Sequence, residues 1–169
     1  MSIHQVKGEQ HKVRPVLDFR ELNKGVASLS GGMSTCAERL REWRTRGLYG
    51  SVVDLKRAYL QVHMARDLWV YQAVCWKGLT YLLTRLGFGL CVAPRVMTAI
   101  VEKVLGLDEE IRALSSSYVD DIFVTGERGN AEKVRDHLER YGLVTKEAAQ
   151  LGDRVSVRVL GLRIDEQLP

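Results

Sequence analysis

Three aspartates stand at places in the sequence where a carboxylate can be held in a fixed position. Asp54 ends the run 49–54 (YGSVVD), which predicts a short buried strand. Asp120 and Asp121 lie between two strand-like runs, 114–119 and 122–125, so they occupy the tip of an expected hairpin. An Asp-Asp pair alone is most often a solvated turn. Here the apolar flanks predict that the strands are buried and hold the tip rigidly.

These three carboxylates define the chemistry that is open to the chain. If the strand that ends at Asp54 neighbours the hairpin, the carboxylates converge, and their mutual repulsion requires cations. Oxygen ligands without histidine or cysteine select Mg²⁺ or Mn²⁺, and two such ions can clamp a phosphoryl displacement. The carboxylates by themselves fit a metal-dependent nuclease as well as a polymerase.

The surrounding pattern indicates how the aspartates are positioned. Thr35 and Glu38 have capping-box spacing at the start of a helix. We expect further hairpin strands at 70–76 with 79–84 and at 114–119 with 122–125, helices at 95–105 and 131–141, and a last strand at 155–164. This order of elements predicts an α+β fold, an antiparallel sheet packed on helices, with the helices on one face.

Composition limits the class of protein further. The 169 residues are 46% hydrophobic and 27% charged, which is typical of one globular domain. No apolar run approaches the roughly 18 residues that span a bilayer. Neither a membrane span nor a secretion signal is expected, and three widely spaced cysteines predict neither disulfides nor a zinc site. Residues 1–107 carry a net charge of +8 and residues 108–169 one of −4. This asymmetry suits a polyanion-binding region beside a metal-binding region, or else an uneven solvated surface.

The hairpin also carries a resemblance to a known family. Its sequence from Tyr118 to Asp121 (YVDD) resembles the YxDD signature of reverse transcriptases. Four further blocks follow in the order of that family: VRPVLDFRELN at 13–23, VDLKRAY at 53–59, LGFGLCVAP at 86–94 and VLGLRI at 159–164. Five blocks in order make the resemblance specific, and it is closest to the polymerases of retroviruses and LTR retrotransposons.

The resemblance implies a right-hand polymerase palm with part of the fingers. Residues 1–48 would be partial fingers and 49–169 the palm, with further fingers elements near 65–90 and the primer grip near 157–164. Thumb, connection and RNase H regions of a Pol polyprotein are expected to be absent. The implied activity is RNA-directed DNA synthesis with two Mg²⁺ ions, or Mn²⁺ in their place. The implied partners are dNTPs and an RNA or DNA template with its primer, without a membrane. The oligomeric state stays open, and the expected location is intracellular, in cytoplasmic particles or the nucleus.

The same resemblance assigns roles to individual residues. The catalytic and metal-binding residues would be Asp54, Leu55, Asp120 and Asp121. The primer grip would be Leu160 and Gly161. The residues that contact the dNTP would be Lys7, Arg14, Lys56, Arg57, Ala58, Tyr59 and Phe88, with the backbone amides of 56–58 facing the triphosphate and Tyr59 acting as a steric gate against a 2′-hydroxyl. Lys146 would lie near the leaving pyrophosphate, and Gln61 would touch the template or only pack.

One departure and two alternatives remain. Gly87 stands where the family usually has proline, which leaves that turn less preset. An RNA-dependent RNA polymerase would more typically have glycine in place of Tyr118 and a smaller or polar residue in place of Tyr59. A catalytically weak or inactive nucleic-acid-binding or assembly module derived from a retroelement would bind without metal-dependent synthesis.

Overall fold

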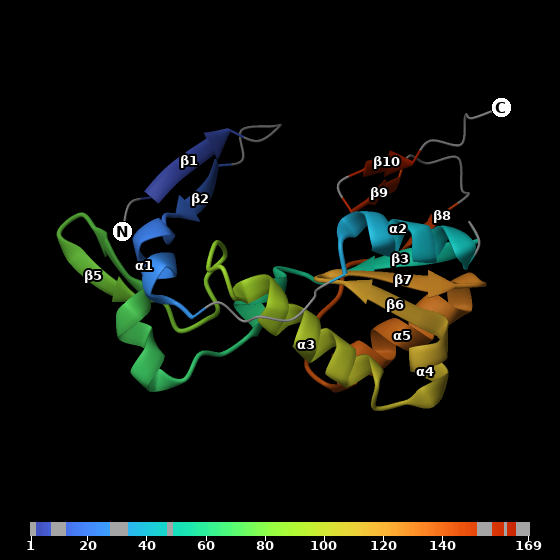
Figure 1. The fold of residues 1–169 in the computed structure, drawn as a ribbon. Helices are drawn as coiled ribbons and strands as arrows, with labels where there is room; N and C mark the ends of the chain where they lie inside the picture. Colours follow the sequence, from blue (N-terminus) through green and yellow to red (C-terminus); the bar gives the residue numbers. More distant parts are fainter. Residues whose placement is uncertain are drawn as a thin grey trace. The chain divides into compact units, whose positions relative to one another are not determined.

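The computed structural model of the chain describes residues 3–7, 13–27, 34–46, 49–151, 157–160 and 162–164 (Figure 1). The chain divides into two compact units. The first comprises Met1–Gly31 and Arg57–Val96, and the second comprises Gly32–Lys56 and Met97–Pro169. No helix in the described ranges is long and apolar enough to cross a membrane.

The first unit contains two antiparallel hairpins and short helices. Its elements are β1 (Ile3–Lys7), β2 (Val13–Leu17), α1 (Arg20–Gly25), η1 (Ala58–Gln61), η2 (Arg66–Gln72), β4 (Ala73–Trp76) and β5 (Leu79–Leu82). The turn between β4 and β5 has positive φ at both Lys77 and Gly78, as expected for a tight two-residue hairpin. The core of this unit consists of Phe19, Leu86, Leu90 and Ala93.

The second unit is built on a four-stranded antiparallel sheet with the order β6-β7-β3-β8. The strands are β3 (Gly50–Asp54), β6 (Ser115–Tyr118), β7 (Asp121–Thr125) and β8 (Ala149–Leu151). The helices are α2 (Cys36–Thr45), α4 (Glu109–Leu114), α5 (Arg128–Arg140) and most of α3 (Ala93–Leu105), which begins in the first unit. A small hairpin of β9 (Val157–Val159) and β10 (Leu162–Ile164) follows.

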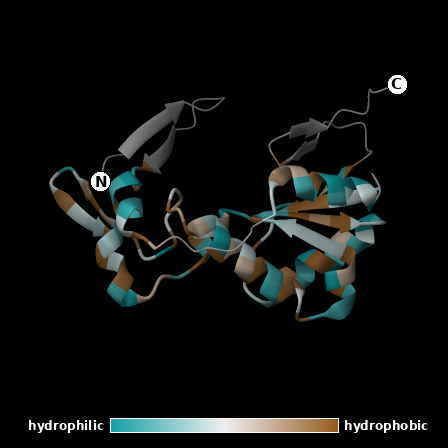
Figure 2. Cartoon of the chain, viewed as in Figure 1, coloured by the Kyte–Doolittle hydropathy of each residue, from teal (hydrophilic) through white to brown (hydrophobic). Residues whose placement is uncertain are grey.

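The sheet is covered on both faces, because its central strands are apolar on both sides. On one face Trp43 of α2 stacks on Phe123, with ring centroids 5.5 Å apart, and both pack against Val52. On the other face lies α5, which buries Val134 and Leu138 (Figure 1). Figure 2 shows the apolar colouring of β7 beside the paler β6, whose first three residues are serines. The prediction of helices on one face is therefore wrong, because the apolar surface of α2 needs a partner of its own.

The other expectations are met to different degrees. The capping box of Thr35 and Glu38 is confirmed, with both hydrogen bonds formed. The strand expected at 70–76 begins only at Ala73, after a 3₁₀ helix. The single strand expected at 155–164 is instead the β9–β10 hairpin, because Leu160 has φ +50° and the chain reverses there. The sequence analysis missed α1, α4 and β8, which are all six residues long or shorter.

Candidate active site

Sheet register brings Asp54 and Asp121 opposite each other at one end of the second unit's sheet. Asp54 is the last residue of β3, Asp121 is the first of β7, and the two are paired residues of the antiparallel ladder. Asp120 lies in the turn that joins β6 to β7, and its carbonyl accepts a hydrogen bond from the Leu55 amide at 3.3 Å. The sheet order therefore places all three aspartates at neighbouring backbone positions.

The turn that carries Asp120 is strained. Tyr118 pairs with Asp121, which leaves only Val119 and Asp120 to reverse the chain. Val119 has φ +57°, a left-handed conformation that is unfavourable for a β-branched residue. Such strain persists only where the surrounding structure enforces it, and it is concentrated at functional sites. Here the buried strands β6 and β7 enforce the turn and fix the direction of the aspartates.

The aspartates repel one another in a partly buried environment. Burial raises the pKa of Asp120, and the charge of Asp54 raises it further. Burial, followed by the charges of Asp120 and Asp54, raises the pKa of Asp121 to about 6. A backbone hydrogen bond from Leu160 and the ammonium group of Lys146 lower the pKa of Asp121 and offset part of this rise. The cluster therefore has an unfavourable negative potential that a cation would relieve.

Lys146 supplies one such positive charge. Its Nζ lies 2.5 Å from Oδ2 of Asp54, and its backbone amide donates to the Asp54 carbonyl at 2.8 Å. The segment before it bonds alongside the end of β3, with a bridge between Thr145 and Leu55. Both side chains of the pair are partly exposed, 54% for Lys146 and 37% for Asp54. The structure thus brings the predicted Lys146 into direct contact with the aspartate cluster.

The donor chemistry of this cluster fits a hard divalent cation. All the candidate ligands are oxygen atoms, which Mg²⁺ and Mn²⁺ prefer. Within the described ranges, however, no three carboxylate, imidazole or thiol side chains are gathered into a ready metal-binding group. At Asp54 one carboxylate oxygen, Oδ2, is already paired with the ammonium of Lys146, which would compete with a metal ion for that oxygen.

The residues predicted to contact the sugar lie together in the first unit. Tyr59 of η1 and Phe88 have ring centroids 5.6 Å apart and an interplanar angle of 59°. Phe88 is 64% exposed, whereas Tyr59 packs on the core of the first unit. An exposed aromatic ring held beside a second ring offers a surface for a sugar or a base.

The turn after Asp54 is only partly available to a ligand. The Lys56 amide, which is expected to face a triphosphate, donates to the Val144 carbonyl at 2.9 Å and so already has a partner within the protein. Arg57 has φ +54° and begins η1, and Ala58 is buried. Their amides remain candidates for phosphate oxygens. The Gln61 carbonyl accepts a hydrogen bond from Arg85 at 3.4 Å, which is a structural contact.

The remaining predicted residues lie in the two small hairpins, β1–β2 and β9–β10. In the β1–β2 ladder Lys7 pairs with Val13 and Arg14 pairs with Val6. Leu160 is half-buried and packs against the cluster formed by Trp43, Val52 and Phe123. Gly161 lies outside the described residues.

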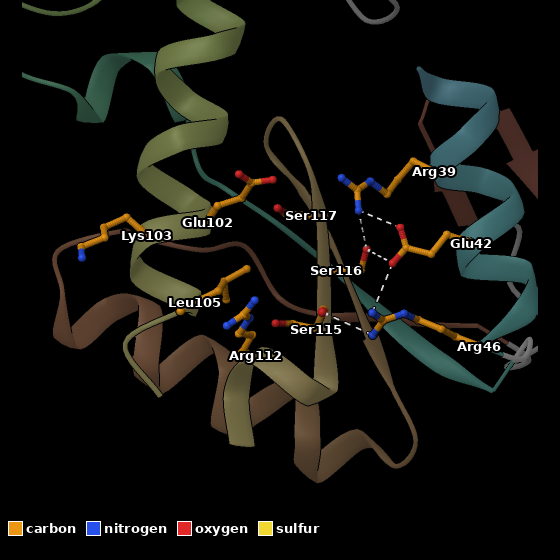
Figure 3. A pocket seen from close by; sticks show the side chains of 11 residues that line it. Arg39, Glu42, Arg46, Glu102, Lys103, Leu105, Arg112, Ser115, Ser116 and Ser117 are labelled. Carbon is orange, nitrogen blue, oxygen red and sulfur yellow. Dashed lines mark hydrogen bonds and ion pairs between the residues drawn. The ribbon is translucent and has the colours of Figure 1, made fainter. Parts of the chain in front are cut away.

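A separate cavity of about 520 Å³ lies beside the free edge of β6 (Figure 3). Arg39 of α2 and Arg46, which follows its end, reach toward it and share the carboxylate of Glu42, at 2.7 and 3.2 Å. Ser116 lines it and accepts hydrogen bonds from Arg39 and from Trp43. On this side of the cavity the basic and acidic groups therefore pair with one another. The sequence analysis missed this network, because a run of three serines carries no sequence signal of burial.

Solved structures of one class of protein, the retroviral protease–reverse transcriptases, match this chain over nearly all of its length. The foamy viral protease–reverse transcriptase dRH in complex with double-stranded DNA matches with a TM-score of 0.75 and 29% identity over 97% of this chain. A mutant of the prototype foamy virus protease–reverse transcriptase matches with a TM-score of 0.78 and 26% identity over 98%. The foamy viral enzyme bound to an RNA/DNA hybrid matches with a TM-score of 0.73 and 26% identity over 97%.

These matches confirm the resemblance on which the sequence analysis relied. The chain is similar in fold and sequence to the reverse-transcriptase portion of retroviral Pol. It spans only 22–29% of the length of these three matched proteins. No family model matches the sequence. No curated protein matches it either.

Proposed function

We propose that the chain is the palm and part of the fingers of an RNA-directed DNA polymerase from a retroelement. The observation that carries the proposal is the pairing of Asp54 with Asp121, with Asp120 in the adjoining turn, in a chain similar to retroviral reverse transcriptases. In this proposal residues 1–48 and the elements near 65–90 are the fingers, and the rest of 49–169 is the palm. The thumb, connection and RNase H regions of a Pol polyprotein would be its partners.

The aspartate cluster would hold two Mg²⁺ ions, or Mn²⁺, through Asp54, Asp120, Asp121 and the backbone of Leu55. When bound, these ions activate the primer 3′-hydroxyl and stabilise the charge on the transferring phosphate and the leaving pyrophosphate. The strained turn and the β3–β7 ladder would keep the carboxylates oriented, so that little reorganisation accompanies the reaction. Lys146, once released from Asp54, would offer its ammonium group to the pyrophosphate.

The other predicted residues would bind and select the substrates. Tyr59 would exclude a 2′-hydroxyl, and Phe88 would lie beside the sugar and base. The amides of Arg57 and Ala58 would donate to triphosphate oxygens, and in the fingers Lys7 and Arg14 would neutralise the β- and γ-phosphates. Leu160 and Gly161 would hold the primer end. The partners would be dNTPs and a primed RNA or DNA template, because the matched enzymes are bound to double-stranded DNA and to an RNA/DNA hybrid.

One observation favours a second function, that of a nucleic-acid-binding or assembly module without synthesis. Lys146 already neutralises Asp54, and the described residues contain no ready group of three metal ligands. A chain that keeps this ion pair in the presence of Mg²⁺ would bind a primed template without extending it. The two functions therefore differ in metal-dependent synthesis and agree in binding.

The decisive experiment is incorporation of dNTPs on an RNA template annealed to a DNA primer, with Mg²⁺ or Mn²⁺. Asp120→Asn removes one carboxylate of the cluster, and Asp136→Asn makes the same change at an exposed position of α5. We expect extension by the native chain and by Asp136→Asn but not by Asp120→Asn. Binding of the primed template without extension at every metal concentration, both by this chain and by its fusion to a reverse-transcriptase thumb, would refute the polymerase and favour the binding module.

A further inference from the structure

Gln72 is a buried polar residue to which the sequence analysis assigned no role. It ends η2, and only 1% of its surface is exposed. A glutamine is rarely buried this completely, because each polar atom of its amide then needs a partner within the protein. Its partners therefore indicate why it is there.

The side-chain amide of Gln72 bonds to three backbone groups of one segment. Its Oε1 accepts from the Gly87 amide at 2.9 Å. Its Nε2 donates to the Arg85 carbonyl at 3.2 Å and lies 3.5 Å from the Leu83 carbonyl. A single side chain thus fixes the backbone from Leu83 to Gly87.

Gly87 is matched to this contact. A Cβ atom at position 87 would lie 2.7 Å from Oε1 of Gln72 and 2.5 Å from the ring of Phe19, so only glycine fits without a shift. Proline would in addition lack the N–H group that donates the hydrogen bond to Gln72. Gln72 and Gly87 therefore act as a pair that fixes the turn by a buried hydrogen bond.

The loop that follows presents Phe88 to solvent and has a second anchor. Asn23 donates to the Gly89 carbonyl at 3.0 Å and accepts from the Cys91 amide at 2.9 Å. Phe88, between two glycines, is thus held between two side-chain amides, with its ring next to Tyr59. A loop with glycine on both sides has little stiffness of its own, so these contacts decide where the ring of Phe88 lies.

We propose that Gln72 is a positioning residue which, through the Gly87 amide, holds Phe88 against Tyr59 and thereby sets discrimination between deoxyribonucleotides and ribonucleotides. This inference rests on the proposed polymerase function, in which Tyr59 meets the 2′ position of the sugar. Loss of the Gln72 contact lets Phe88 and Tyr59 separate. The clearance for a 2′-hydroxyl then increases.

The first arm of the test measures positioning without catalysis, by hydrogen exchange of backbone amides in the full chain. Gln72→Leu keeps most of the volume and removes the three contacts. We expect the amide of residue 87 to exchange about tenfold faster in this variant, while the amides of β3 and β7 keep their rates. Gln150→Leu, the same change in β8 of the other unit, serves as the control and should leave the exchange at residue 87 unchanged. Unchanged exchange in Gln72→Leu would overturn the positioning role.

The second arm measures selection, as the ratio of kcat/KM for dCTP to that for CTP, which differ only at the 2′ position. We expect this ratio to fall about tenfold in Gln72→Leu and to stay constant in Gln150→Leu. If Gln72→Leu does not fold, Asn23→Ala replaces it in the test. Asn23 is half-buried and is the other anchor of the loop, so its removal should also lower the ratio. Equal losses for both nucleotides would overturn the selection role. Faster exchange at residue 87 in Gln72→Leu, together with no nucleotide incorporation by the native chain or by its fusion to a thumb, would instead refute the polymerase function and leave the positioning role standing.

Discussion

Replacing Asp121 by asparagine should stabilise the folded protein at neutral pH when no divalent cation is present. The pKa of Asp121 is raised to about 6 from its usual value of 3.8, so the folded state favours the protonated carboxyl. A group of this kind contributes stability that is present below its unfolded pKa and is lost as the pH rises through the folded pKa. The native protein should therefore lose stability as the pH rises from about 4 to 6. Asp121→Asn has no carboxyl at this position and should not show this loss.

The size of the effect follows from the two pKa values. At 1.36 kcal/mol for each pH unit, the difference between 3.8 and about 6 gives an upper bound of about 3 kcal/mol at pH 8. Because the Asp121 carboxyl is only partly buried, screening by solvent reduces this to about 1–2 kcal/mol. For a chain of this length, that free energy corresponds to a rise in melting temperature of about 2–8 °C. Asparagine keeps an oxygen for the hydrogen bond from the Leu160 backbone. The substitution therefore removes mainly the buried charge.

The measurement is thermal and urea unfolding from pH 4 to pH 8 in the presence of a chelator. The difference between Asp121→Asn and the native chain should be near zero at pH 4 and reach its full value above pH 7. Asp136→Asn makes the same change at an exposed position and serves as the control. Added Mg²⁺ should stabilise the native chain more than Asp121→Asn. A gain of equal size at every pH would refute the argument, because uncharged packing changes do not titrate.

Three further predictions concern the core, the ion pair and the gate. Trp43→Phe keeps an aromatic ring in the core but leaves the Ser116 hydroxyl without the indole donor at 2.8 Å. Urea unfolding should therefore show a free energy of unfolding that is lower by about 1–2 kcal/mol. An unchanged free energy of unfolding would contradict that hydrogen bond. Lys146→Gln removes the ammonium group that competes with a metal ion for the Asp54 carboxylate. Calorimetry should show Mg²⁺ binding up to about fivefold tighter, because an exposed ion pair contributes at most about 1 kcal/mol. Weaker binding would indicate that Lys146 assists metal binding. Under the proposed function, Tyr59→Val relieves the steric overlap between the ring and a 2′-hydroxyl. The use of ribonucleotides relative to deoxyribonucleotides should rise about tenfold, which corresponds to about 1.4 kcal/mol. An unchanged ratio of the two in primer extension would exclude Tyr59 as the gate.

The sequence predicted those parts of the fold whose signal is local. Alternating or continuous apolar residues around Asp120 and before Asp54 are sufficient for short buried strands, and Thr35 with Glu38 is sufficient for a helix start. Elements that depend on their neighbours were missed or misread. The segment 155–164 has the composition of one strand, yet it reverses at Leu160, and Ala149–Leu151 becomes a strand only because β3 offers it an edge.

The candidate site divides in the same way. Residue type and order predicted the three aspartates, because carboxylates at strand ends are visible in the sequence, and the resemblance to reverse transcriptases indicated Tyr59 and Phe88. Only the tertiary structure decided which groups at the site already have a hydrogen-bond or ion-pair partner within the protein. The Lys56 amide is already bonded, as is the carboxylate of Asp54. No pattern in the sequence predicts these partners, because they come from a segment about ninety positions away.

The sequence by itself therefore determined the chemistry of the chain, namely which acidic and aromatic residues it carries and on which local elements. The tertiary structure decided which groups meet. The sheet order sets Asp54 opposite Asp121 across 67 positions of sequence, and the buried amide of Gln72 reaches 15 positions along the chain to Gly87. Local propensity acts over a few residues. Contacts of this range form only when burial of the whole core offsets the entropy of closing the intervening chain.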